Sequence, residues 1–325
     1  MRVLAFAVRK DEELAFEKFK IKFDLTVDIE YQSLNPESVE LAKGYDMITF
    51  LGSCNVNSEV LEKLHYFGIK YIASRSTGYD NIELHKAKEL GMKISNSTYS
   101  PYSVAEFTLM LALMMLKNIP LTFSNTSKNN FSLKGLMGRE IRSQTVGIIG
   151  NGKIGKIVAK YFKSLGANVL IYDLYPQEVE FNCASLDEVL KKSDIISLHS
   201  PLTTENRYLI NAENIKKMKD GVIIINTARG ELIDGDSLIE NLKNGKLGGV
   251  ALDTLEDEIG IFHRDCNRSG FNHEILKKLL KFKNVCITPH QAFYTDQAVS
   301  DMVESALENL YNFYTTGNSY NNLIK

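Results

Sequence analysis

The chain has 325 residues and a formal net charge of −2, so it is long enough for two domains and has no charge excess that would favour a nucleic acid as partner. Its four cysteines form no C-x-x-C pair and are interpreted as reduced thiols, with no metal site. The apolar run at 3–8 is too short for a signal peptide, and the most apolar run, 107–116, is well short of the ~20 residues of a spanning helix. We therefore expect a cytoplasmic protein with no membrane partner.

The first hundred residues alternate short apolar runs with charged helical segments. Strands are expected at 3–8, 26–31, 47–51, 71–74 and 93–95. Helices are expected at 12–20, 36–42, 58–66 and 82–90, the last ending before Gly91. This alternation predicts a doubly wound parallel sheet.

A long helix, expected from Pro101 to about Lys117, precedes a second series of the same kind. Its strands are expected at 145–149, 169–172, 194–198, 222–226, 249–252 and 285–288. Its helices are expected at 186–191, 211–218, 236–243 and, near the end of the chain, 296–314. The sequence thus predicts two α/β domains, with the functional site in the cleft between them.

A glycine-rich turn follows the first strand of the second series. It reads Gly150-Asn151-Gly152-Lys153-Ile154-Gly155, and Asp173 ends the next strand about 18 residues further on. The first glycine permits a tight turn, the second lets the backbone approach a pyrophosphate, and the third lets the next helix pack closely. A carboxylate at Asp173 would bind ribose hydroxyls and repel a 2′-phosphate. The motif predicts dinucleotide binding, with NAD favoured over NADP.

Later strands of the second series end in polar residues, at the edge where open α/β sheets bind ligands. These are His199-Ser200-Pro201, Thr227-Ala228-Arg229, Asp253 followed by Glu256 and Glu258, and Pro289-His290. Reduction of a 2-oxo acid needs a guanidinium for the substrate carboxylate, an imidazolium to protonate the carbonyl oxygen, and a carboxylate to orient that imidazolium. Arg229, His290 and Glu258 match these three roles.

Several residues allow more than one interpretation. His199 suits packing in a cofactor groove as well as a chemical role. Glu256 is interpreted as a solvated neighbour of Glu258, although the two could exchange roles. His263 and Cys266 have the spacing of a metal pair, but no second pair accompanies them, so a surface loop is favoured. The apolar segment 107–115 suits a core helix or a dimer interface.

The chain resembles the D-isomer-specific 2-hydroxyacid dehydrogenases over nearly its whole length. The resemblance lies in 145–155 (TVGIIGNGKIG), 197–202 (SLHSPL), 226–230 (NTARG), 251–258 (ALDTLEDE) and 287–295 (ITPHQAFYT). Within this family it is most similar to D-lactate dehydrogenases, including the type found in glycopeptide-resistance clusters. It is also similar to 2-hydroxyisocaproate and (R)-2-hydroxyglutarate dehydrogenases. The resemblance implies NADH-dependent reduction of a small 2-oxo acid, pyruvate being favoured, to the D-2-hydroxy acid.

The resemblance also implies roles for individual residues. Arg229 would hold the substrate carboxylate, His290 would be the acid/base and Glu258 its partner. The substrate would also contact Thr77, Gly78, Tyr99 and Phe293. The cofactor would contact Gly150, Gly152, Lys153, Ile154, Gly155, Asp173, His199, Ser200, Pro201, Asn206, Thr227, Ala228 and, near the nicotinamide, Asp253.

The implied architecture has a flavodoxin-like substrate domain, residues 1–99 and 296–325, and a Rossmann NAD domain, residues 100–295, in a homodimer. The loop after the third strand departs from the pattern. Leu51 stands where several D-lactate dehydrogenases have a tyrosine and where the hydroxyglutarate enzymes place an arginine close by, so a short or apolar substrate side chain is favoured. An NAD(H)-sensing corepressor-like scaffold, which shares this fold, is the non-enzyme alternative.

Overall fold

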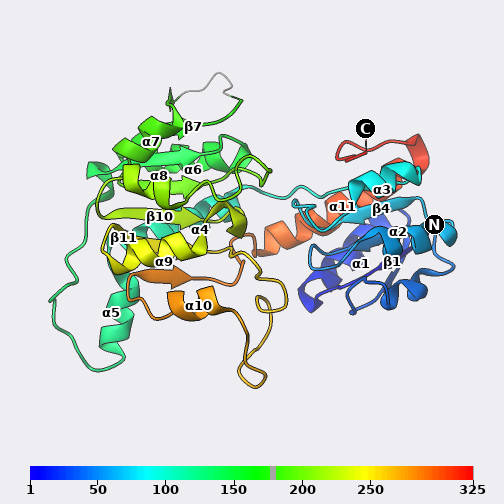
Figure 1. Cartoon of the computed structure of the whole chain (residues 1–325). Coiled ribbons are helices and arrows are strands. Elements are labelled where there is room, and N and C mark those ends of the chain that lie inside the picture. Colours follow the sequence, from blue (N-terminus) through cyan, green and yellow to red (C-terminus); the bar gives the residue numbers. More distant parts are fainter. Residues whose placement is uncertain (176–180, 325) are drawn as a thin grey trace. The chain divides into compact units, whose positions relative to one another are not determined.

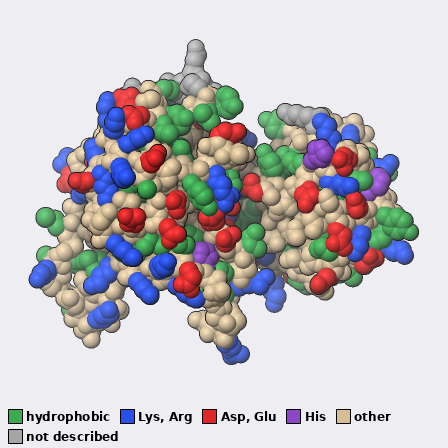
Figure 2. Space-filling model, in the orientation of Figure 1, with side chains coloured by type: hydrophobic (Ala, Val, Ile, Leu, Met, Phe, Trp, Pro, Cys, Tyr) green, Lys and Arg blue, Asp and Glu red, His purple; other side chains and the backbone are tan. Residues whose placement is uncertain are grey.

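The computed structural model describes residues 1–175 and 181–324, so Lys325 of the predicted 296–325 segment lies outside the described residues. The chain divides into two compact units (Figure 1). Unit 1 comprises Met1–Ser100 and Tyr294–Lys325, and unit 2 comprises Pro101–Phe293. Both ends of the chain therefore belong to unit 1. Figure 2 shows acidic and basic side chains interspersed on the visible face of each unit.

The sheet of unit 1 has five parallel strands in the order β2-β1-β3-β4-β5, which is the flavodoxin-like order. Its strands are β1 (Arg2–Ala5), β2 (Thr26–Ile29), β3 (Met47–Phe50), β4 (Tyr71–Ser74) and β5 (Lys93–Ser95). Its helical elements are η1 (Lys10–Glu12), α1 (Glu13–Lys22), η2 (Ser38–Ala42), α2 (Ser58–Tyr66), α3 (Leu84–Glu89) and α11 (Asp296–Thr316). All five predicted strands are present. The helical segment predicted at 36–42 is present as η2, which is a 3₁₀ helix.

Alternation along β1 explains why unit 1 needs the end of the chain. Successive side chains of a strand point to opposite faces of the sheet. Val3 and Ala5 pack with α1 and with Leu307 of α11, whereas Leu4 and Phe6 pack in the core that contains α2. Helix α11 thus covers one face of a sheet that is built from the first hundred residues.

The sheet of unit 2 has seven parallel strands in the order β12-β11-β10-β9-β6-β7-β8. They are β6 (Thr145–Ile149), β7 (Asn168–Tyr172), β8 (Asn182–Cys183), β9 (Ile195–Leu198), β10 (Val222–Asn226), β11 (Leu247–Leu252) and β12 (Val285–Ile287). This is the Rossmann arrangement extended by β12, and the order reverses between β6 and β9. Ligands of such sheets bind outside the carboxyl ends of the strands at this reversal, which is where the glycine turn follows β6.

Helices cover both faces of this second sheet. They are α4 (Tyr102–Leu116), α5 (Ile119–Thr126), α6 (Lys153–Ser164), α7 (Leu186–Lys192), α8 (Ala212–Lys217), α9 (Gly235–Lys243) and α10 (Glu274–Leu279), with η3 (Ile141–Ser143) and η4 (Gly230–Leu232). One core contains residues of α4 and α6, and a second contains residues of α7 to α10. Elements β8, α5 and α10 are not among the predicted strands and helices. β8 has two residues, and α5 buries none of its side chains, so neither produces a periodic apolar pattern.

Helix α4 is the buried helix predicted from its composition, with eight buried residues including Leu111 and Met115. Within the described part of the chain, no single helix is long and apolar enough to cross a membrane. Helices α4 and α5 meet the length and composition criteria only as a pair bent by 63°.

Candidate active site

The glycine turn after β6 has no room for a side chain at two of its three glycines. Gly150 has φ +99°, and a Cβ atom there would lie 2.6 Å from the backbone of His199. A Cβ atom on Gly155 would lie 2.0 Å from the carbonyl oxygen of Gly150. For Gly152, in contrast, the described residues leave the surroundings of a Cβ atom empty to 4 Å. Gly152 therefore faces open space, as the approach of a phosphate requires.

Helix α6 begins at Lys153, directly after this glycine, so the amides of Lys153 and Ile154 have no acceptor within the helix. Such amides at a helix N-terminus bind phosphate groups. Beside them, the buried Asn151 Oδ1 and Ser200 Oγ have no hydrogen-bond partner among residues 1–175 and 181–324. Free amides and unpaired buried oxygens at one turn fit a ligand that carries phosphates and hydroxyls.

Asp173 directly follows β7 and closes the other side of the turn. Its Oδ2 accepts a hydrogen bond from the Asn151 amide at 2.5 Å, and its Oδ1 accepts one from the Tyr175 amide at 2.8 Å. Each oxygen of an ionised carboxylate accepts about two hydrogen bonds, so both retain capacity for ribose hydroxyls. The turn and Asp173 together fit a dinucleotide without a 2′-phosphate.

Alanine substitutions at two glycines of this turn are expected to separate folding from cofactor binding. Gly152→Ala keeps an allowed backbone, with φ −72°, and should shift the melting temperature by less than about 2 °C while lowering NADH affinity about tenfold or more. Gly155→Ala drives a methyl group into a carbonyl oxygen and should lower the melting temperature by about 5 °C or more. Thermal unfolding and NADH fluorescence titration measure both effects. Unchanged NADH affinity in Gly152→Ala would contradict this phosphate site.

His199 packs against the same turn. Its Cβ lies 3.5 Å from the position of a Cβ on Gly155, and its Nε2 lies 2.8 Å from Ser197 Oγ. Burial lowers the pKa of His199 to about 3, so the imidazole is neutral near pH 7. A neutral, buried imidazole is unsuited to protonate a substrate, and of the two interpretations the geometry favours packing.

The loop after β9 is held by Asn206, which is 9% exposed. Its Nδ2 donates to the carbonyl of Pro201 at 2.7 Å, and its Oδ1 accepts from the amide of Thr203 at 2.7 Å. The predicted cofactor residues Ser200, Pro201 and Asn206 thus belong to one closed loop beside the glycine turn, since a Cβ atom on Gly150 would lie 2.6 Å from the Ser200 amide nitrogen.

Arg229 is held by a residue that the sequence analysis did not identify. Asn226, the fully buried last residue of β10, donates from Nδ2 to the carbonyl of Arg229 at 2.7 Å and accepts at Oδ1 from the amide of Ala228 at 3.0 Å. Arg229 Nη1 donates to the carbonyl of Ala228 at 2.8 Å, and Thr227 Oγ1 lies 3.0 Å from Thr108 Oγ1. An asparagine at a strand end is the signal that indicates such a turn.

His290 and Glu258 come together although 32 residues separate them. The Nδ1 of His290 makes a close hydrogen bond to Oε1 of Glu258, and Oε2 of Glu258 accepts from the amide of Leu255 at 2.8 Å. The imidazole is 34% exposed and the carboxylate 20%. The ring of Phe293 stands edge-on to His290, with centroids 6.3 Å apart. Because Nδ1 is occupied, Nε2 is the nitrogen left to exchange a proton with a substrate.

Asp253 is fully buried, and its carboxylate holds the turn that carries His290. Its Oδ1 accepts from Thr288 Oγ1 at 2.6 Å and from the Gln291 amide at 2.9 Å, and its Oδ2 accepts from the Ala292 amide at 2.9 Å. Its backbone carbonyl also accepts from the His290 amide at 2.8 Å. These contacts give Asp253 a structural role in addition to its predicted role as a cofactor contact near the nicotinamide.

Glu256 is not the solvated carboxylate that the sequence analysis expected. Its Oε1 accepts from Arg207 Nη2 at 2.5 Å and from the Tyr208 hydroxyl at 2.7 Å, and its side chain is 27% exposed. The ambiguity between the two glutamates is thereby resolved, because Glu258 contacts His290 and Glu256 holds Arg207.

Unit 1 carries the other predicted substrate contacts, in the loop after β4. Thr77 Oγ1 donates to the carbonyl of Ser97 at 3.0 Å, and the Thr77 carbonyl accepts from Asn96 Nδ2 at 2.8 Å. The Gly78 carbonyl accepts from Ser76 Oγ at 2.7 Å. The loop is thus anchored at several points to the segment that follows β5.

Arg75, directly before this loop, is a second residue that the sequence analysis missed. It is fully buried, donates from Nε to Glu12 Oε1 at 2.9 Å and from Nη2 to the carbonyl of Phe6 at 2.9 Å. Glu12 is the last residue of η1, so the ion pair connects the loop to η1. Loss of either partner would leave an uncompensated buried charge, which makes this connection costly to break. The predicted substrate contact Tyr99 belongs to the segment that follows β5 in the sequence, and its side chain is half-buried.

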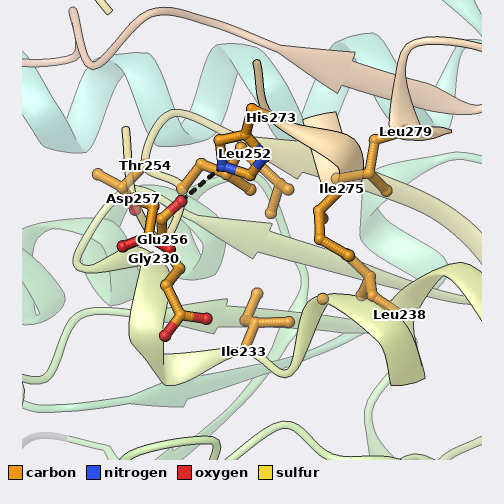
Figure 3. A pocket seen from close by; sticks show the side chains of 12 residues that line it. Gly230, Ile233, Leu238, Leu252, Thr254, Glu256, Asp257, His273, Ile275 and Leu279 are labelled. Carbon is orange, nitrogen blue, oxygen red and sulfur yellow. Dashed lines mark hydrogen bonds between the residues drawn. The ribbon is translucent and has the colours of Figure 1, made fainter. Parts of the chain in front are cut away.

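A small cavity of about 70 Å³ lies within unit 2 (Figure 3). Its lining includes Ile233, Leu238, Ile275 and Leu279, and His273 Nε2 at its edge bonds the carbonyl of Glu256 at 2.8 Å. The space holds about two water molecules, and none of the proposed catalytic side chains lines it. It is therefore not the substrate site.

No group of three or more potential metal ligands gathers in the part of the chain that the structure describes. His263 and Cys266, which have the spacing of a metal pair, lie in the loop between β11 and α10, where no such group forms among the described residues.

Comparisons with known proteins agree with this geometry. Residues 109–292 match the family described as D-isomer specific 2-hydroxyacid dehydrogenase, NAD binding domain. The chain is 46% identical to an aromatic 2-oxoacid reductase of Clostridium sporogenes (100% of this chain, 99% of that one) and 38% identical to a D-lactate dehydrogenase of Lactiplantibacillus plantarum (98% and 97%). A solved D-2-hydroxyisocaproate dehydrogenase superimposes with a TM-score of 0.91 at 36% identity, over 100% of both chains.

Proposed function

Because the chain belongs to the D-isomer-specific 2-hydroxyacid dehydrogenases, which use NAD, we propose that it reduces a 2-oxo acid with an apolar side chain to the D-2-hydroxy acid. The observation that carries this proposal is the contact between His290 and Glu258 in the same unit as Arg229 and the glycine turn. An acid, a cation and a cofactor turn are the three parts that the reaction needs.

Bound NADH supplies the hydride that the carbonyl carbon of the substrate receives. In the proposed mechanism, Arg229 pairs with the substrate carboxylate through two parallel hydrogen bonds and thereby orients the carbonyl group. Glu258 holds Nδ1 of His290, so the Nε2 proton passes to the carbonyl oxygen as the new C–H bond forms. In the reverse direction, the same nitrogen accepts the hydroxyl proton.

The division of labour between the units is part of the proposal. Residues 1–99 and 296–325 would bind the substrate through Thr77, Gly78 and Tyr99, and residues 100–295 would bind NAD and supply Phe293. We also propose a cytoplasmic homodimer. Exposed apolar side chains on unit 2, namely Phe123 (65% exposed), Phe131 (75%) and Met137 (91%), support self-association, which sedimentation analysis would test.

For the substrate side chain we propose that an aromatic or branched apolar group is preferred over the methyl group of pyruvate. The relative named aromatic 2-oxoacid reductase, at 46% identity, supports the aromatic group. Leu51, which packs on the core of unit 1, offers no cation for a second carboxylate, so 2-oxoglutarate is disfavoured. Pyruvate is the second candidate, supported by the relative named D-lactate dehydrogenase.

Initial rates with phenylpyruvate, 2-oxoisocaproate, pyruvate and 2-oxoglutarate, each with NADH and NADPH, test the proposal. Chiral analysis of the products should give the D isomer. The substrate proposal predicts the highest kcat/KM for phenylpyruvate and the lowest for 2-oxoglutarate. If none of these acids supported NADH oxidation, the enzymatic proposal would be wrong and the NAD(H)-sensing scaffold would replace it.

Asp173→Asn is expected to weaken the preference for NADH. The amide oxygen can still accept the Asn151 hydrogen bond, but the negative charge that opposes a 2′-phosphate is removed. The ratio of kcat/KM for NADPH to that for NADH should rise about tenfold, which is the effect of about 1.4 kcal/mol. Asp187→Asn, on the exposed end of α7, is the control and should leave the ratio unchanged. An unchanged ratio in Asp173→Asn would refute the role of this carboxylate.

A further inference from the structure

His263 belongs to a short loop that begins at Glu258. The amides of Ile261 and Phe262 both donate to the carbonyl of Glu258, at 3.0 Å each, which folds the segment 258–262 into a tight turn. His263 follows with φ 63°, in the left-handed region that few residues other than glycine adopt. The turn and this backbone conformation direct the chain back toward the end of β12, where His290 lies.

The imidazole of His263 contacts the main chain of the proposed acid/base. Its Nε2 lies 3.0 Å from the carbonyl oxygen of His290. A carbonyl oxygen can only accept, so Nε2 of His263 must carry the proton. The two rings lie 6.1 Å apart, and the ring of Phe293 is 6.3 Å from His263 and 6.3 Å from His290.

His290 is itself in a conformation that needs restraint. Its φ of 52° is unfavourable for a residue with a Cβ atom, so the surrounding contacts must maintain it. The amide donates to the carbonyls of Asp253 and Thr288, at 2.8 and 2.9 Å, and the ring is held by Glu258. The contact from His263 completes this set by holding the carbonyl.

We propose that His263 is a positioning residue for His290. The segment 258–263 makes two hydrogen bonds with His290, one between Glu258 and the ring and one from His263 to the main-chain carbonyl. Together they set the direction in which Nε2 of His290 points. This inference rests on the proposed function, in which that nitrogen transfers the proton. The role needs a hydrogen-bond donor at the position of Nε2, and it needs no chemistry at His263 itself.

Kinetics of paired variants test this role. His263→Phe keeps a ring but removes the donor, and should lower kcat on the order of tenfold because the acid is misaligned, with KM for NADH unchanged. His263→Gln retains an N–H donor of similar reach and should recover kcat to within about threefold of the wild type. His65→Phe, at an exposed histidine of α2, is the matched control and should behave as wild type.

Three kinetic outcomes would overturn the proposal. They are a His263→Phe variant with wild-type kcat, a His263→Gln variant as impaired as His263→Phe, and an effect confined to KM for NADH. A wild-type chain with no activity on any 2-oxo acid would instead overturn the proposed function on which the inference rests.

The hydrogen bond itself can be tested without turnover. The chain has six histidines, so ¹⁵N-histidine labelling gives a spectrum simple enough to assign by the signal lost in His263→Gln. The neutral ring of His263 should be the Nε2–H tautomer, because only that form donates to the His290 carbonyl. A neutral ring protonated at Nδ1 would have no proton on the nitrogen in contact, and the proposal would fail whatever the activity.

Discussion

His290→Gln is expected to lower kcat for 2-oxo acid reduction by about 10²–10⁴-fold, the range that general acid catalysis contributes. Glutamine can reach Glu258 with its amide, but it has no proton to transfer to the carbonyl oxygen. The NADH affinity should not change, since the glycine turn and Asp173 follow β6 and β7 while His290 follows β12. Stopped-flow measurement of NADH oxidation under single-turnover conditions would isolate the chemical step.

The control for His290→Gln is a change of the same type at a histidine outside the site. His85→Gln, at the exposed start of α3, should keep wild-type kcat. If His290→Gln retained more than about a tenth of wild-type kcat, the loss of rate would be smaller than the usual contribution of a general acid. Another group would then have to supply the proton. His199 could not do so near pH 7, because burial lowers its pKa to about 3.

Arg229→Lys is expected to lower kcat/KM for the 2-oxo acid by about 10–100-fold, which corresponds to the ~1.5–3 kcal/mol of one charge-assisted hydrogen bond. The planar guanidinium presents two parallel N–H groups to a carboxylate, whereas the lysine ammonium is a single point charge. The loss should appear mainly in KM for the 2-oxo acid. Steady-state kinetics with saturating NADH measure it.

The matched control is Arg207→Lys in the same unit. Arg207 pairs with Glu256 and has no proposed contact with the substrate, so exchange of its guanidinium for an ammonium should change kcat/KM by less than about threefold. Wild-type kcat/KM in Arg229→Lys would show that this arginine does not bind the carboxylate in a bidentate manner, and the assignment of substrate recognition would have to change.

The parts of the site that depend on residues close together in the sequence were predictable from the sequence. A Cβ on Gly155 would meet the carbonyl of Gly150, and a Cβ on Gly150 would meet the loop after β9, so the pattern of glycines reports a geometric requirement of the turn. The position of Asp173 at the end of the next strand follows from the length of one βαβ unit. The ends of the predicted strands were less accurate, since β1 ends at Ala5 and not at residue 8.

The supporting residues were not predictable in this way. Asn226 left a local signal at the end of β10, but Arg75 and His263 left none. The partner of Arg75, Glu12, lies 63 residues away, and His263 lies 27 residues from His290. No periodicity or motif links such pairs, because their contact depends on how two loops fold over the ends of different strands.

The sequence by itself therefore determined the two α/β units, the dinucleotide turn and the residue types that a hydride transfer needs, because each of these depends on strand–helix periodicity or on spacing within one βαβ unit. Only the tertiary structure decided that Glu258 and not Glu256 contacts His290, and that Asp253 holds the turn behind it. Glu256 and Glu258 differ by two positions in one loop, and the path of that loop in space decides which carboxylate reaches the imidazole.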